Sequence, residues 1–134
     1  MVNQNYDAAI FQDLGSAPAT LEAARAADAY GCSPGNAIEV ADAEQAYVQA
    51  EMEGTPTWIS LPPEQRRGKA KHMRKPVYRL RKALYGHPDS GTFWEKKFDL
   101  HAKSVGFEPV GTEWPSCYFH RSLALFLMVY VDDF

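Results

Sequence analysis

The sequence lacks the features that mark several large classes of protein. Its 134 residues contain only two cysteines, Cys32 and Cys117, with neither zinc-ligand spacing nor the density of a secreted disulfide scaffold. The longest apolar run, Leu123–Val131, is much shorter than the roughly 20 residues that a membrane-spanning helix needs. We find no signal-peptide pattern, Rossmann glycine fingerprint, phosphate-binding loop or internal repeat. These absences predict a soluble, intracellular protein without a membrane partner.

Two parts of the chain carry charge of almost only one sign, acidic in the first and basic in the second. Residues 1–65 contain ten Asp and Glu but a single basic residue, Arg25. Residues 66–82 contain no acid and nine of the fourteen Lys and Arg. A block of this kind is typical of a polyanion-binding surface, although charge alone fits a solvated loop equally well. The predicted nucleic-acid-binding residues are the nine cations Arg66, Arg67, Lys69, Lys71, Arg74, Lys75, Arg79, Arg81 and Lys82.

Apolar residues make up 46% of the chain, enough for one folded domain with helices and strands in alternation. Thr20 and Gly31 are the expected N-cap and stop of a first helix, and Gly106 is expected to end an amphipathic helix over 88–107. Strands are predicted over 37–41 and 55–63, and a hairpin over 116–133 with its break at 120–122. The order suggests a layered α+β or α/β sandwich with helices packed on one sheet.

The chain ends LALFLMVYVDDF, so nine apolar residues lead directly to Asp132 and Asp133. Adjacent carboxylates repel each other unless a cation lies between them. The pair therefore indicates a metal site, or else a polar chain end. Asp42, at the end of the predicted strand 37–41, is a third acid that a shared sheet edge could bring to the same point. Mg²⁺ binds in proteins through one or two carboxylates together with substrate phosphates.

Three segments, occurring in order, strengthen the metal hypothesis. They are DAEQAYVQAEMEGTPTWISLPPE (42–64), VYRLRKALYGHPDSGTFWEKKF (77–98) and the ending LFLMVYVDDF. Together they closely resemble the reverse transcriptase domain of copia-type LTR retrotransposons, over residues 7–134. The resemblance implies a palm-like sheet with helices packed on one face, ending at the Tyr-Val-Asp-Asp motif. It also implies that the fingers strands and the thumb lie outside these residues, and that the chain is a piece of a longer polyprotein.

The resemblance assigns roles to particular residues. Asp42, Asp132 and Asp133 correspond to the catalytic carboxylates, which hold two Mg²⁺ ions or substitute Mn²⁺, with the carbonyl of Ala43 as an additional ligand. Two ions about 4 Å apart activate a primer 3′-hydroxyl and stabilise the leaving pyrophosphate. Tyr47 falls where the family has an aromatic steric gate against ribonucleotides, although ordinary core packing also fits this residue.

The segment LYGHPDSGTFW departs from the wording of the family. Asp89 stands where a glutamine normally touches the incoming nucleotide, and Gly91 stands where a proline starts the helix. An acid at that position would repel a triphosphate, so we favour Asp89 as the N-cap of the helix, with Pro88 as its compensating start.

The implied function is RNA-directed DNA polymerase, with an RNA or DNA template-primer and dNTP as partners of the full-length parent. The alternative is a catalytically inactive transposon-derived remnant that binds nucleic acid or metal at most, and we expect the 134 residues alone to be inactive. The remaining side chains suggest no other chemistry. Surface or packing roles are expected for His72, His87, His101 and His120, and packing roles for Trp58, Trp94 and Trp114.

Overall fold

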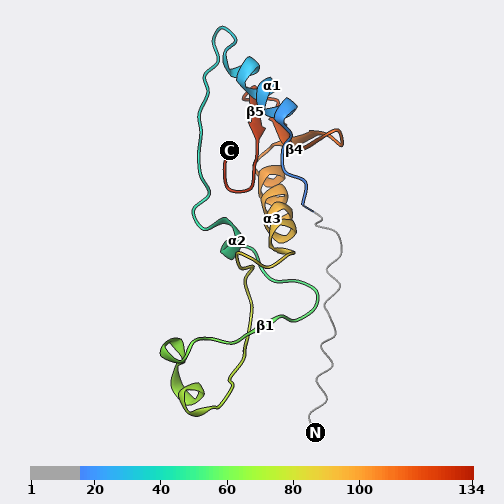
Figure 1. Cartoon of the computed structure of the whole chain (residues 1–134). Helices are drawn as coiled ribbons and strands as arrows, with labels where there is room; N and C mark the ends of the chain where they lie inside the picture. The colour runs from blue at the N-terminus through green and yellow to red at the C-terminus, as the bar shows by residue number, and fades with distance from the viewer. Residues whose placement is uncertain (1–15) are drawn as a thin grey trace.

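The computed structural model describes residues 16–134, which form an α+β unit with two small antiparallel sheets. The helices are α1 (Leu21–Gly31), α2 (Ala46–Gln49) and α3 (Ser90–Ser104), with two short 3₁₀ helices, η1 (Pro63–Gln65) and η2 (Gly68–His72) (Figure 1). The strands are β1 (Trp58–Ile59), β2 (Tyr78–Arg79), β3 (Glu108–Gly111), β4 (Trp114–His120) and β5 (Leu125–Met128). The larger sheet has the order β3-β4-β5 and the smaller one pairs β1 with β2. None of the helices in this range is long and apolar enough to cross a membrane.

The β4–β5 hairpin confirms the predicted strand pair, but helices cover both faces of its sheet. Cys117 pairs with Met128, and on that face they pack with Ala23 of α1. Tyr118, one residue further along β4, lies in a second cluster with Ala102 of α3. Successive side chains of a strand point to opposite faces. The prediction that helices pack on one face is therefore wrong, because the nearly continuous apolar sequence of these strands supplies packing surface on both sides.

The ends of the two long helices show which cap predictions hold. The Thr20 hydroxyl accepts a hydrogen bond from the Ala23 amide at 3.2 Å, which confirms the predicted N-cap of α1. Gly106 ends α3 with φ +101°, and the amides of Gly106 and Phe107 donate to the carbonyls of Lys103 and Ala102. These two bonds are the Schellman pattern, so the predicted stop at Gly106 is also confirmed.

Gly31 ends α1, as predicted, but without a left-handed cap. It is the last residue of the helix, and the following Cys32 keeps right-handed dihedral angles. A Cβ at Gly31 would overlap Cγ1 of Ile38. Glycine here leaves room for that side chain where the chain returns past the helix, and it does not form a left-handed cap.

Six of the nine basic residues lie on a projecting element that we call the basic arm, residues 60–77, and Arg79, Arg81 and Lys82 come after it in the chain. The β1–β2 ribbon carries it, with Trp58 opposite Arg79 and Ile59 opposite Tyr78. Figure 1 shows the arm extending away from α2 and from the rest of the structure. The predicted strand 55–63 is thus reduced to two residues, and Trp58 is 58% exposed, so its assignment to packing is wrong.

Residues 37–41 form no regular strand, contrary to prediction. The segment nevertheless ends in backbone pairing with the C-terminal residues. The amides of Ala41 and Phe134 each donate to the other residue's carbonyl, at 2.6 and 2.9 Å. This pairing joins two segments that are distant in the sequence and positions the acidic residues beside them.

Candidate metal centre

Backbone pairing brings Asp42 directly opposite Asp133. The two residues form an isolated antiparallel bridge, flanked by a hydrogen bond from the Ala43 amide to the Asp132 carbonyl at 2.6 Å and by the Ala41–Phe134 pair. In this pattern the opposed residues exchange no hydrogen bonds themselves, and such pairs hold their side chains closest together. The backbone itself therefore directs the carboxylates of Asp42 and Asp133 to the same face.

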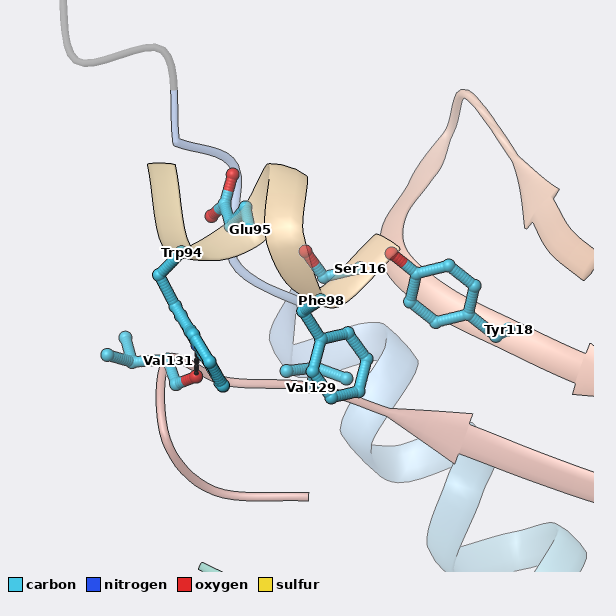
Figure 2. A pocket seen from close by; sticks show the side chains of 7 residues that line it. All are labelled: Trp94, Glu95, Phe98, Ser116, Tyr118, Val129 and Val131. Atoms are coloured by element: carbon cyan, nitrogen blue, oxygen red, sulfur yellow. Dashed lines mark hydrogen bonds between the residues drawn. The ribbon is translucent and has the colours of Figure 1, made fainter. Parts of the chain in front are cut away.

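Asp132 reaches the same place from a tight turn. The amides of Tyr130 and Asp133 each donate to the other residue's carbonyl, at 2.8 and 3.0 Å, which leaves Val131 and Asp132 as the two central residues. Val131 has φ +60°, the conformation that glycine usually provides at the first central position of a type II′ hairpin turn. The carbonyl of Val131 accepts a hydrogen bond from the indole nitrogen of Trp94 at 2.6 Å (Figure 2).

The three aspartates form one cluster, which we call the acidic triad (Asp42, Asp132 and Asp133). One carboxylate oxygen from each residue lies within 4.8 Å of the other two. Asp132 is half-buried, whereas Asp42 and Asp133 are exposed. Carboxylate oxygens gathered from a turn and a neighbouring segment are a donor set that suits a hard divalent cation. Within residues 16–134 no other group of three His, Cys, Asp or Glu side chains meets the same criterion of mutual closeness. The role of the Ala43 carbonyl as a further ligand remains a prediction.

Tyr47 lies beside the triad. Burial raises the pKa of its phenol above the usual value of 10.0, and the nearby carboxylate of Asp132 raises it further, followed by Tyr85 and Glu95. Its ring packs against that of Tyr85 with centroids 4.6 Å apart. The phenol oxygen lies 4.0 Å from where a Cβ of Gly91 would stand, so the ring reaches the first turn of α3. This placement fits a steric gate, although the role itself stays a prediction.

Asp89 occupies the N-cap position of α3, as predicted, but its side chain makes no capping hydrogen bond. Instead, the hydroxyl of the fully buried Ser90 organises this end of the helix. It accepts a hydrogen bond from the Leu84 amide at 3.0 Å and donates one to the Leu84 carbonyl at 2.7 Å. The substrate-binding role of Asp89 remains a prediction, and the buried serine is the anchor that the sequence did not reveal.

The amphipathic pattern of residues 88–107 would place Glu95 on the polar face of α3, yet its side chain is half-buried. Its carboxylate accepts a hydrogen bond from the Ala17 amide at 3.0 Å and, together with Trp94 and Val131, lines two small hollows next to the turn. Figure 2 draws these three residues among those that line one hollow. Burial raises the pKa of Glu95, and the Ala17 hydrogen bond partly offsets that increase. No local sequence signal could have revealed a contact made by a segment so far along the chain.

The nine predicted nucleic-acid-binding cations are not equivalent. Lys82 forms an ion pair with Glu51 at 2.7 Å and also donates to the Gln49 carbonyl, whereas Arg66 donates to the Leu61 carbonyl. The other seven are exposed, and in residues 16–134 they form no ion pair or side-chain hydrogen bond. They are Arg67, Lys69, Lys71, Arg74, Lys75, Arg79 and Arg81. These seven side chains remain available to an anionic partner.

No cationic side chain is paired with the acidic triad. In the part of the chain that the structure describes, no Lys or Arg forms an ion pair with Asp42, Asp132 or Asp133.

Comparisons with protein-family models, with curated proteins and with solved structures found no match for this chain.

Proposed function

We propose that this chain carries the metal-binding palm segment of an RNA-directed DNA polymerase of the copia-type reverse transcriptase family. One observation carries the proposal. The two segments that the resemblance assigns to metal binding are paired through their backbones, and they bring carboxylate oxygens of Asp42, Asp132 and Asp133 within 4.8 Å of one another. Chance similarity of short motifs would not require these segments to meet.

In the proposed site Asp42 and Asp132 are the principal ligands and Asp133 lies beside them. The carboxylates fit divalent Mg²⁺ or Mn²⁺ because they are all oxygen donors and because a cation relieves their mutual repulsion. When bound, the ions supply activation of a primer 3′-hydroxyl and stabilisation of pyrophosphate. The half-buried position of Asp132 restricts its side chain, whereas the exposed Asp42 leaves one side of the site open to a substrate.

Tyr47 is the proposed selector of the sugar. Its phenol ring is held by Tyr85 next to Asp132, so it restricts the space beside a nucleotide bound at the metal site. A deoxyribose needs less room than a ribose at that point, and dNTP is therefore the proposed substrate. The exposed cations of the basic arm are the proposed contact for the phosphates of a template-primer.

A second candidate function applies to the 134 residues by themselves. In residues 16–134 no Lys or Arg forms an ion pair with the triad, so the structure holds no cation at the triad itself to meet an incoming triphosphate. This favours a catalytically inactive fold that binds divalent metal and nucleic acid. In this second candidate the chain descends from a polymerase, but its 134 residues do not polymerise DNA by themselves.

Metal binding provides the direct test. Electron paramagnetic resonance of free Mn²⁺ measures the affinity of the wild-type chain and of Asp42→Asn and Asp132→Asn, each of which should weaken binding roughly tenfold or more. Asp28→Asn is the matched control, since Asp28 is an exposed carboxylate on α1 outside the triad. Affinity that is the same in all four proteins contradicts the metal site.

Primer extension tests the second candidate separately. The isolated chain is incubated with primer-template, dNTP and Mg²⁺ or Mn²⁺, and no incorporation is expected. Incorporation that Asp132→Asn abolishes would show that the isolated chain polymerises, and would reject the inactive fold in favour of the enzyme.

A further inference from the structure

The turn that carries Asp132 has an unusual residue at its first central position. Val131 has φ +60°, where a β-branched side chain is strongly disfavoured and glycine is normally found. The two backbone hydrogen bonds between Tyr130 and Asp133 close the turn but do not fix the peptide between Val131 and Asp132. Turn types that differ only by a flip of this central peptide direct the following side chain differently. Something else must select the orientation that the structure shows.

Trp94 contacts this central peptide directly. Its side chain is buried, at 5% exposure, and the indole nitrogen donates to the Val131 carbonyl at 2.6 Å. A buried indole N–H needs an acceptor, so the bond satisfies both partners. Figure 2 shows the Trp94 ring lying alongside the turn, with the bond drawn to Val131. The bond comes from α3, a helix of 15 residues with a well-defined C-terminal cap.

A second hydrogen bond fixes the peptide on the other side of Asp132. The Ala43 amide donates to the Asp132 carbonyl at 2.6 Å. Asp132 thus has a restrained peptide before it, held by Trp94, and a restrained peptide after it, held by Ala43. Its side chain has little freedom to turn away from Asp42 and Asp133.

We infer that Trp94 is a positioning residue for the acidic triad. Its indole N–H holds the central peptide of a strained turn and so directs the Asp132 carboxylate toward the proposed metal ions. The inference rests on the proposed metal-binding function and adds to it a residue outside the triad. It assigns to Trp94 a role distinct from core packing, which the ring also performs against Phe98 at a centroid distance of 5.9 Å.

The experiment separates the N–H from the ring. Trp94→Phe keeps an aromatic side chain and removes the donor, and Mn²⁺ affinity is measured by electron paramagnetic resonance of the free ion. We expect affinity to fall roughly tenfold to a hundredfold, the usual effect of removing a group that orients a metal ligand. Val131→Gly alone should bind Mn²⁺ nearly as the wild type does, since Trp94 still holds the peptide.

The double variant Trp94→Phe with Val131→Gly gives the decisive comparison. Glycine adopts φ +60° without strain, so the turn should keep its shape without the indole bond and much of the lost affinity should return. Poorer core packing around residue 94 would not be rescued by a glycine in the turn. Failure of the rescue, or Mn²⁺ affinity of Trp94→Phe within twofold of the wild type, overturns the inference.

Two controls keep the outcomes distinct. Circular dichroism establishes that each variant is folded; if Trp94→Phe does not fold, β-(3-benzothienyl)alanine at residue 94 keeps the bicyclic ring and replaces the N–H with sulphur. If the wild-type chain binds no Mn²⁺, the proposed function fails and the inference fails with it. If the wild type binds Mn²⁺ and Trp94→Phe binds it equally well, the proposed function stands and only the inference about Trp94 fails.

Discussion

Asp42 and Asp133 face each other across an antiparallel bridge, although they come from distant parts of the sequence. Their carboxylates, with that of Asp132, share a space that a single divalent ion can span. An arrangement of three like charges is unfavourable unless it is compensated. The stability of the fold and the binding of an ion at the triad are therefore thermodynamically linked.

Asp133→Asn should stabilise the chain when divalent ions are removed with EDTA. Neutralising one of three neighbouring carboxylates removes a repulsion of about 1 kcal/mol at most for these partly exposed groups. Thermal unfolding should show a small increase in Tm relative to wild type, and Asp28→Asn should show none. The order should reverse with Mn²⁺ present, because ion binding stabilises the wild type more. A variant less stable than wild type in EDTA would indicate that the carboxylate makes a structural contact instead.

Glu95→Gln should stabilise the fold at neutral pH. Burial raises the pKa of Glu95 in the folded chain, so the folded state binds the proton more tightly than the unfolded state does. The stability from this group is fully present below its unfolded pKa of about 4.5 and is lost as the pH rises through the higher folded value. Glutamine is neutral throughout, and its amide oxygen can still accept the Ala17 N–H.

Urea unfolding at pH 7 and at pH 4 measures this effect. The advantage of Glu95→Gln over wild type should be present at pH 7 and should shrink at pH 4. Glu64→Gln, an exposed position in η1, is the control and should show little effect at either pH. An advantage of equal size at both pH values would point to packing and not to charge.

The basic arm should make nucleic-acid binding dependent on salt. Each cation that neutralises a phosphate steepens the slope of log affinity against log salt by roughly 0.7 to 0.9. Changing Arg67, Lys69 and Lys71 together to glutamine should therefore flatten the slope measured by fluorescence anisotropy. The matched single comparison is Arg67→Gln against Lys82→Gln; Lys82→Gln should change the slope much less, since Lys82 is paired with Glu51. Affinity that does not vary with salt would remove the arm as a phosphate contact.

Gly106→Ala should destabilise the chain by more than Gly35→Ala. Both glycines have positive φ, +101° and +89°, so alanine is strained at either position by about 1 kcal/mol. Only at residue 106 would the new Cβ also meet a side chain, 2.6 Å from Nε2 of His120. The difference in the free energy of unfolding between the two variants isolates that contact, and equal effects would mean that His120 moves aside freely.

Local signals in the sequence predicted the helix caps and the hairpin, because a Thr20 N-cap, a Gly106 stop and an apolar run act within a few residues. They failed where contacts between distant segments determine the structure. The second covered face of the sheet and the partner of Glu95 depend on tertiary packing. The exposure of Trp58 follows from the projecting ribbon, which periodicity does not reveal. The meeting of the triad was first suggested by acids at the ends of two predicted strands, and the family resemblance strengthened that expectation.

The ribbon beneath the basic arm has only two residue pairs, and the arm contributes little to either hydrophobic cluster. Such an attachment can open without disturbing the main sheet, so its backbone amides should exchange with deuterium well before those of β4. A polyanion would then bind to a basic arm that is attached through β1 and β2 but unfolds independently of the main sheet. Ordering of the basic arm on binding would reduce the net affinity, because the arm loses conformational entropy when it is immobilised.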